Sequence, residues 1–237
     1  VKNNTSVLVS GLQNDVSGNT IQSIVSGFKN MENNGQNNAI FGREHSDISG
    51  QNLLIDGSSN TTINTSNSII SGKDNTVNSG YESLVLGMEN QAKSIKNSIV
   101  SGTLNDVSSN ITNTMVIGKG NKVYNPALPM TEYISSIHTG NDHTITNVKT
   151  SLTSGQNHTI TSSINGVAVG NENQSLNDDN TVTMGNLNNV SQNTNTLIVG
   201  KSNIVSNTNQ TTVLGEGNNQ IQFSTNSLIS GKNNKEN

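Results

Sequence analysis

Pairs of adjacent apolar residues recur along the chain, and a glycine follows the second of each pair by two positions. We call these glycines the repeat glycines: Gly11, Gly27, Gly42, Gly57, Gly72, Gly87, Gly102, Gly118, Gly140, Gly155, Gly170, Gly185, Gly200, Gly215 and Gly231. Ten of the fourteen intervals between them are 15 residues, three are 16 and one is 22. A disordered chain does not hold one phase this long, so the pattern predicts a repeat architecture.

Each repeat contains the elements of two short strands. Ser or Thr, two apolar residues, a variable residue and glycine, as in Ser68-Ile69-Ile70-Ser71-Gly72, predict a strand that ends in a turn with positive φ at the glycine. A weaker apolar position follows five or six residues after the glycine: Val16, Ile48, Ile63, Val77, Val107, Val123, Ile145, Ile160, Val190 and Val205. Fifteen residues are too few for a three-sided β-helix, which needs about 18, so the pattern favours a flattened, two-sided parallel β-roll.

Consecutive apolar residues in the first strand predict a sheet that is apolar on both faces. Successive side chains of a strand point to opposite faces, and pairs such as Leu54-Ile55 and Ile99-Val100 therefore supply both. One face can pack inside the roll, and the other needs a cover from outside. We therefore expect an isolated chain to be unstable and a closed rotational assembly of identical chains to form.

Composition excludes several classes of protein. The 237 residues include 44 Asn, 32 Ser, 25 Thr and 22 Gly, more than half of the chain, with 3% aromatic residues, no Trp and no Cys. A helical bundle and a disulfide framework are therefore excluded. The net charge is −4 with scattered Lys and Arg, which argues against a nucleic-acid or anionic-membrane surface. No apolar run approaches membrane-spanning length and no secretory leader opens the chain, so export or anchoring segments would lie outside this piece.

The repeat resembles the head domain of trimeric autotransporter adhesins, the YadA-like heads, in copies such as Asn97-Ser98-Ile99-Val100-Ser101-Gly102 and Asn226-Ser227-Leu228-Ile229-Ser230-Gly231. The resemblance runs from about Ser6 to Gly231. It implies an all-β, left-handed parallel β-roll (a β-solenoid) of about fifteen 15-residue coils over residues 1–237, assembled as a homotrimer. It further implies a virulence-associated cell-adhesion protein on the bacterial surface, displayed from the outer membrane. The implied partners are host receptors of the CEACAM kind or the extracellular-matrix proteins collagen, fibronectin and laminin. The chain departs from the family where Asn replaces a smaller polar residue after the glycine and Ser often precedes the glycine.

One interval, from Gly118 to Gly140, carries seven extra residues and both prolines. Proline cannot donate to a β-ladder, so this segment is expected to leave the roll as an inserted loop at about 124–133. The loop is a candidate partner-binding site, a lock between chains or a tolerated insertion, and its residues are Tyr124, Asn125, Pro126, Ala127, Leu128, Pro129, Met130, Thr131, Glu132 and Tyr133.

Other polar positions point to structure more than to chemistry. Asn stands three residues after twelve of the repeat glycines and is expected to form a side-chain amide ladder, with His45, His143 and His158 substituting for it in the other three repeats. Asp178-Asp179-Asn180 is expected to be a solvated turn. Carboxylates cluster nowhere that would raise a pKa, and no catalytic set stands out. The sequence therefore predicts no enzyme activity, no cofactor and no metal. The structural alternative to an adhesin is a passive spacer or fibre segment with no ligand of its own.

Overall fold

A computed structural model describes residues 4–108, 111–124, 135–217 and 221–235. The chain divides into unit 1 (Val1–Lys119) and unit 2 (Gly120–Asn237). It is an all-β parallel solenoid of about 14 turns, which confirms the architecture predicted from the repeat. Fifteen repeat glycines enclose fourteen intervals, which accounts for the difference from the expected fifteen coils. Within the described ranges there is no helix, and hence none suited to crossing a membrane.

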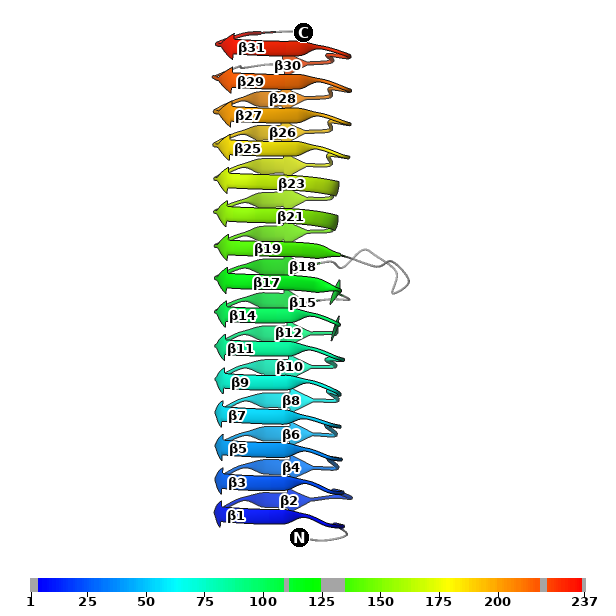
Figure 1. The fold of residues 1–237 in the computed structure, drawn as a ribbon, viewed down its shortest axis with the longest axis vertical. Coiled ribbons are helices and arrows are strands. Elements are labelled where there is room, and N and C mark those ends of the chain that lie inside the picture. The colour runs from blue at the N-terminus through cyan, green and yellow to red at the C-terminus, as the bar shows by residue number, and fades with distance from the viewer. Residues whose placement is uncertain (1–3, 109–110, 125–134, 218–220, 236–237) are drawn as a thin grey trace. The chain divides into compact units, whose positions relative to one another are not determined.

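Unit 1 consists of two facing parallel sheets and a short edge ladder (Figure 1). Its long-strand sheet contains β1 (Leu8–Leu12), β3 (Ile24–Phe28), β5 (Ala39–Arg43), β7 (Leu54–Ser58), β9 (Ile69–Lys73), β11 (Leu84–Met88), β14 (Ile99–Thr103) and β17 (Thr114–Lys119). Its short-strand sheet contains β2 (Asp15–Ser17), β4 (Met31–Asn33), β6 (Ser46–Ile48), β8 (Thr61–Ile63), β10 (Thr76–Asn78), β12 (Gln91–Lys93) and β15 (Asp106–Ser108). At one edge, β13 (Ile95–Lys96) pairs with β16 (Ile111–Thr112).

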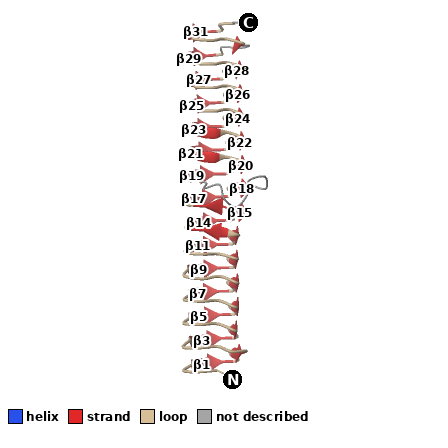
Figure 2. Cartoon of the chain, turned by 90° about the vertical axis from the view of Figure 1, so that its right-hand side faces the viewer, coloured by secondary structure: helices blue, strands red, loops and turns tan. Residues whose placement is uncertain are grey.

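Unit 2 repeats the two-sheet arrangement. Its long-strand sheet contains β19 (Ser136–Asn141), β21 (Lys149–Gln156), β23 (Ile164–Asn171), β25 (Val182–Asn186), β27 (Leu197–Lys201), β29 (Thr212–Glu216) and β31 (Leu228–Lys232). Its short-strand sheet contains β18 (Lys122–Tyr124), β20 (Thr144–Thr146), β22 (Thr159–Thr161), β24 (Gln174–Leu176), β26 (Asn189–Ser191), β28 (Ile204–Ser206) and β30 (Ile221–Gln222). Seen from the side, the long and short strands of each unit form two separate layers (Figure 2).

The register brings equivalent positions of neighbouring repeats together. Ile69 pairs with Leu84 and Gly72 pairs with Gly87. The backbone at Gly72 has φ of +119°, a conformation that side chains rarely permit, and a Cβ there would overlap the carbonyl oxygen of Gly87. The predicted positive φ at the repeat glycines is confirmed, and glycine is required both for that conformation and for the close stacking of the turns.

The long-strand sheet has one buried and one exposed apolar column, as the sequence predicted. Ile70, two residues before Gly72, is 0% exposed, whereas its neighbour Ile69 is 44% exposed. The buried column of unit 1 consists of Val25, Ile40, Ile55, Ile70, Val85, Val100 and Val116. These side chains face the inward residues of the short strands, so the core of each turn lies between the two layers.

Two expected core residues of the short strands instead face outward. Ile48 and Ile63 lie six residues after a repeat glycine and are partly exposed, while the preceding residues Asp47 and Thr62 are buried. The position five residues after the glycine points inward and the sixth points outward, because successive side chains of a strand alternate. The apolar pattern of the sequence does not separate these two positions.

Candidate functional site

An exposed or partly exposed apolar column runs along the long-strand sheet of each unit, and we call this column the outer stripe. It contains the residue three positions before each repeat glycine: in unit 1 Leu8, Ile24, Ala39, Leu54, Ile69, Leu84, Ile99 and Met115, and in unit 2 Ile137, Leu152, Val167, Val182, Leu197, Thr212 and Leu228. In unit 1, Leu8, Ile24, Leu54 and Ile69 are 61%, 41%, 38% and 44% exposed, so the column leaves apolar side chains open to water along one face of the sheet. No member of the column is charged.

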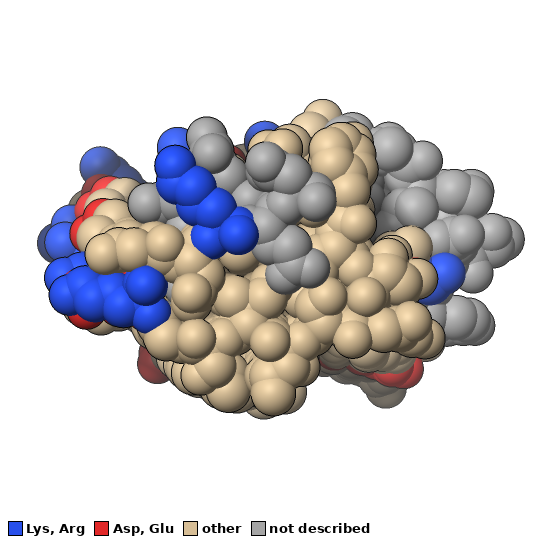
Figure 3. Space-filling view, turned by 90° about the horizontal axis from the view of Figure 1, so that it is seen from above, with Lys and Arg blue, Asp and Glu red and all other residues tan. Residues whose placement is uncertain are grey.

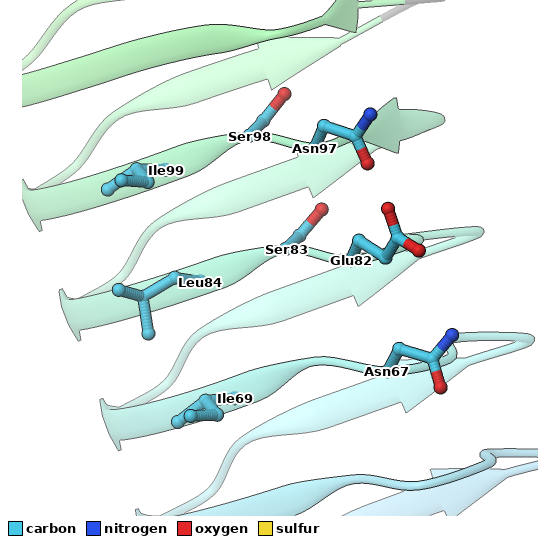
Figure 4. A pocket seen from close by; sticks show the side chains of 8 residues that line it. All are labelled: Asn67, Ile69, Glu82, Ser83, Leu84, Asn97, Ser98 and Ile99. Carbon is cyan, nitrogen blue, oxygen red and sulfur yellow. The ribbon is translucent and has the colours of Figure 1, made fainter.

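A shallow groove runs beside the outer stripe in unit 1, and we call its most developed part the Glu82 groove. Figure 4 shows its lining: one wall is formed by stripe residues, the opposite wall by Asn67, Glu82 and Asn97, and serines lie between them. The residues that line it are Asn67, Ile69, Glu82, Ser83, Leu84, Asn97, Ser98 and Ile99. The three residues of the polar wall, Asn67, Glu82 and Asn97, each lie five positions before a repeat glycine and have a positive φ of about 50°. The groove thus combines an apolar wall with a polar wall that contains one carboxylate.

Hydrogen bonds between turns hold the floor and the polar wall of the groove in place. The Ser83 hydroxyl donates to the carbonyl oxygen of Tyr81 at 3.0 Å, and its backbone N–H donates to the Ser68 hydroxyl at 3.1 Å. In the polar wall, the side-chain amide of Asn52 donates to that of Asn67 at 2.8 Å, and the amide of Asn97 donates to that of Asn113 at 3.3 Å. Glu82 stands between these two amide pairs and interrupts the exposed ladder.

The predicted Asn ladder three residues after the repeat glycines is confirmed, and it is buried. The amide Nδ2 of Asn90 donates to Oδ1 of Asn75 at 3.0 Å, to the carbonyl oxygen of Leu86 at 3.0 Å and to that of Gly102 at 3.0 Å. Oδ1 of Asn90 in turn accepts the backbone N–H of Asn105 at 3.1 Å. Each asparagine therefore satisfies turn carbonyls that would otherwise be buried without a donor.

His45, His143 and His158 replace asparagine in this ladder atom for atom. Nδ1 of His45 accepts the backbone N–H of Asn60 at 3.1 Å, as an amide oxygen would, and Nε2 contacts the carbonyl oxygen of Phe41 at 2.9 Å. The rings of His143 and His158 stack with centroids 5.0 Å apart. Burial lowers the pKa of all three residues. Because Nδ1 accepts a hydrogen bond, each ring is neutral with its proton on Nε2.

A fourth histidine, His138, occupies the buried apolar column of unit 2. It is fully enclosed, and burial, with a smaller contribution from the charge of His143, lowers its pKa to about 3. Its Nδ1 has no hydrogen-bond partner, and neither does the hydroxyl of Thr153, the register partner of His138 in the next turn. Polar groups here replace the Val or Ile found at this column in unit 1, at a cost in desolvation.

Two carboxylates are stacked inside unit 1, where the sequence analysis expected none to cluster. Glu32 and Asp47 are register partners on β4 and β6, and both are fully buried. The amide Nδ2 of Asn38 lies between them, 3.0 Å from Oε1 of Glu32 and 2.9 Å from Oδ2 of Asp47. The hydroxyl of Thr62, one turn further on, donates to Oδ1 of Asp47. Oε2 of Glu32 has no partner.

Burial perturbs both carboxyl groups. It raises the pKa of Glu32 from 4.5 to about 7, against the opposing effects of Ser23 and Asn38, and the charge of Asp47 adds a small increase. It raises the pKa of Asp47 from 3.8 to about 6, against the hydrogen bond from Thr62. A Cβ at Gly50 would overlap the Asp47 carboxylate, so glycine at that position makes room for it. The expectation that no carboxylate raises another's pKa was therefore wrong.

The turn at Asp178 also differs from the expectation. Asp178 is buried, not solvated: its Oδ1 accepts the backbone N–H of Asn193 at 2.9 Å and the side-chain amide of Asn193 at 3.0 Å. Ser175 donates to its Oδ2 at 2.7 Å, and burial raises the pKa of the carboxyl. Asp178 belongs to the inner wall of its turn, as do the buried Thr65, Asn193 and Thr208, which also lie seven positions before a repeat glycine.

The inserted loop contributes little to this description. Of the ten candidate partner-binding residues, Tyr124 ends β18 and is 45% exposed, and the other nine, residues 125–133, lie outside the described residues. Whether the loop binds a partner or locks neighbouring chains stays a prediction.

The chemistry available at these sites is limited. Within the described part of the chain, no group of three or more His, Cys, Asp or Glu side chains is arranged to hold a metal ion. The end-on view of the C-terminal turns shows large areas that are neither acidic nor basic (Figure 3). The sequence matches no known family model and no curated protein. The most distinctive features of the described surface are the outer stripe and the Glu82 groove.

Proposed function

We propose that this chain is the head of a trimeric bacterial surface adhesin, in which three copies pack their outer stripes around a common axis. One observation carries the assembly: the residue three positions before the repeat glycine is apolar in fourteen of fifteen repeats, yet the fold leaves it exposed or partly exposed in every repeat. A side chain such as Ile69 contributes little to the stability of an isolated chain in that position, and burial against a second copy would remove its apolar surface from water.

Closed symmetry fits this surface. The outer stripe repeats at every turn along one face of the long-strand sheet, and identical strips of this kind can face one another when the copies are related by rotation. The absence of charge from the column removes the desolvation cost that a buried ion would impose. The homotrimer and the left-handed course of the roll are parts of the proposal that rest on the resemblance to YadA-like heads.

The adhesive role also rests on that resemblance. We propose that the head is displayed from the outer membrane and attaches bacteria to host receptors of the CEACAM kind or to extracellular-matrix proteins. It would act by binding alone, without catalysis or a cofactor. Three sites per trimer and many trimers per cell give firm attachment from weak individual contacts, because the later contacts form at high effective concentration.

The mass of the protein in solution tests the assembly. Light scattering after size-exclusion chromatography should give three times 25.0 kDa. Ile69→Asp in the outer stripe should release monomers, whereas Ile204→Asp, at a residue of matching 43% exposure on the outward face of β28, should leave the trimer intact. A folded wild-type monomer at micromolar concentration contradicts the proposal, and so does equal dissociation of the two variants.

Binding by the isolated trimer tests the adhesive role. The trimer should bind at least one member of a panel of collagen, fibronectin, laminin and CEACAM-type ectodomains, and a passive spacer should bind none. Replacing residues 126–130 by a Gly/Ser linker separates the two roles of the inserted loop. Lost binding with unchanged melting temperature indicates a binding loop, and unchanged binding with a lower melting temperature indicates a lock between chains.

A further inference from the structure

In unit 1 the outer stripe is apolar throughout, so it offers no directional contact between copies. A slip of one turn, about 4.8 Å, would place each stripe residue opposite the next equivalent residue, for example Leu84 where Ile69 had been. Apolar contacts distinguish poorly between such arrangements, since they are non-directional. Charged groups beside the stripe, which do not repeat at every turn, are therefore the candidates for a specific contact between copies.

On the long-strand sheet of unit 1, one such group lies in the groove. Glu82 is the only charged residue among the described unit 1 positions five before a repeat glycine, where the others are Ser6, Gln22, Asn37, Asn52, Asn67, Asn97 and Asn113. At the C-terminal ends of the long strands, one residue after the repeat glycine, lie Arg43, Lys73 and Lys119. Asp56 is a further charge on this face, on the column just before the glycine, and is exposed.

Glu82 and Lys73 cannot meet within one chain. Glu82 precedes β11 by two residues and Lys73 ends β9 beside Met88, so the length of β11, about 13 Å, separates them. Among the described residues, no ion pair involves Glu82, and the Lys73 ammonium lies 3.4 Å from the Asp74 carboxylate with both side chains well exposed. An exposed neighbouring pair of this kind is weak, so Lys73 can exchange it for another partner.

A rotation about an axis parallel to the stacking direction brings the two ends of the long strands of neighbouring copies together. In a closed ring each copy is related to the next by rotation without translation. The strand ends beside Glu82 on one copy therefore meet the C-terminal strand ends of its neighbour at the same height. The neighbour then presents Met88, from the same turn as Glu82, with Lys73 one turn, about 4.8 Å, away. The lysine side chain is long enough to cover that step.

We propose that the Glu82 groove receives the Lys73 ammonium of a second copy. Ile69, Leu84 and Ile99 form the apolar wall along the lysine stem, and the Asn67 and Asn97 amides flank the carboxylate (Figure 4). The inference rests on the proposed trimer and adds to it a specific contact between the copies.

Charge reversal tests the pair. Glu82→Lys and Lys73→Glu should each raise the concentration at which the trimer half-dissociates about tenfold, since a modest exposed ion pair is lost at three interfaces at once. The double variant should return to within about threefold of wild type. Asp106→Lys and Lys93→Glu make the same charge changes at exposed residues of the short-strand sheet and should have no effect. A wild-type monomer would refute the proposed function itself, whereas a wild-type trimer whose Glu82 and Lys73 variants behave like these controls would overturn only the ion pair.

Cross-linking gives an independent test that works for a trimer of any stability. The chain has no cysteine, so Glu82→Cys and Lys73→Cys can be introduced together as the only thiols. A short bis-maleimide should link the double variant into covalent dimers and closed trimers, and neither single variant should be linked. Failure of the double variant to cross-link while light scattering still shows a trimer would overturn the proposed contact between Glu82 and Lys73, and so would efficient linking of Glu82→Cys alone.

Discussion

Replacing Glu32 by glutamine should stabilise the protein at alkaline pH and have much less effect at acid pH. Glutamine keeps the shape of the side chain and the acceptor for the Asn38 amide, but it cannot ionise. In the wild type, the carboxyl is fully buried and its Oε2 lacks a partner, and burial raises the pKa from 4.5 to about 7. The folded chain therefore binds the proton more tightly than the unfolded chain.

The sign and size of the effect follow from linkage. A raised folded-state pKa gives most stability below pH 4.5, and this stability is lost as the pH rises through 7. With 1.36 kcal/mol per pKa unit, the ionised carboxylate costs about 3 kcal/mol at pH 8 and less than about 1 kcal/mol at pH 5. Glu32→Gln should therefore gain about 2 kcal/mol more at pH 8 than at pH 5, relative to the wild type.

Urea unfolding of both proteins at the two pH values measures this difference. Comparing variant with wild type at each pH cancels the titration of every group that the substitution leaves unchanged. Glu44→Gln is the matched control, because it makes the same substitution at an exposed carboxylate outside the groove, and it should change the free energy of unfolding little at either pH. A Glu32→Gln difference that is the same at pH 5 and pH 8 would refute the assignment of a buried, desolvated carboxyl.

Two further substitutions test the core. Gly72→Ala should destabilise the protein by about 3 kcal/mol or more in urea unfolding, since it combines a disfavoured φ with overlap on Gly87. The control Gly166→Ala, at a glycine that has room for a Cβ, should be neutral or slightly stabilising. Equal losses of stability in the two variants would contradict the stacking argument. His138→Val should stabilise by about 2 kcal/mol more at pH 5 than at pH 8, because a folded-state pKa of about 3 makes the wild type lose stability as the pH falls below 6.5. A gain independent of pH would show that the folded ring accepts a proton readily.

The periodic features could be predicted from the sequence because each of them recurs in most of the repeats. The repeat glycines fix the turns, and the paired apolar residues such as Ile69 and Ile70 fix which strand has two apolar faces. The amide ladder could be predicted because stacking places like residues in contact, and histidine offers the same acceptor and donor as asparagine.

The features that the sequence did not predict occur once or twice each. Glu32 and Asp47 look like ordinary surface acids, and their burial depends on which of two adjacent positions points inward, a difference of one residue in short strands. Because Ile48, next to Asp47, fits the apolar pattern of the short strands, the sequence alone points to Ile48 as the buried residue and not to Asp47. Gly50 is the signal that could have revealed it, since glycine at this inner position clears space for the carboxylate.

The outer stripe needs an explanation from outside the single chain. Thr212 occupies one place in the stripe, and its strand still pairs in full register with Leu197 and Leu228 on either side. The backbone ladder and the inner column therefore tolerate a polar side chain there. Fourteen apolar residues stand at this position although the stacking of turns does not require them. Each exposes surface that water disfavours and contributes little to the packing of its own turn. A single chain gains nothing from such a column, whereas an assembly that buries it would gain at every turn, and this is why we propose contact between copies.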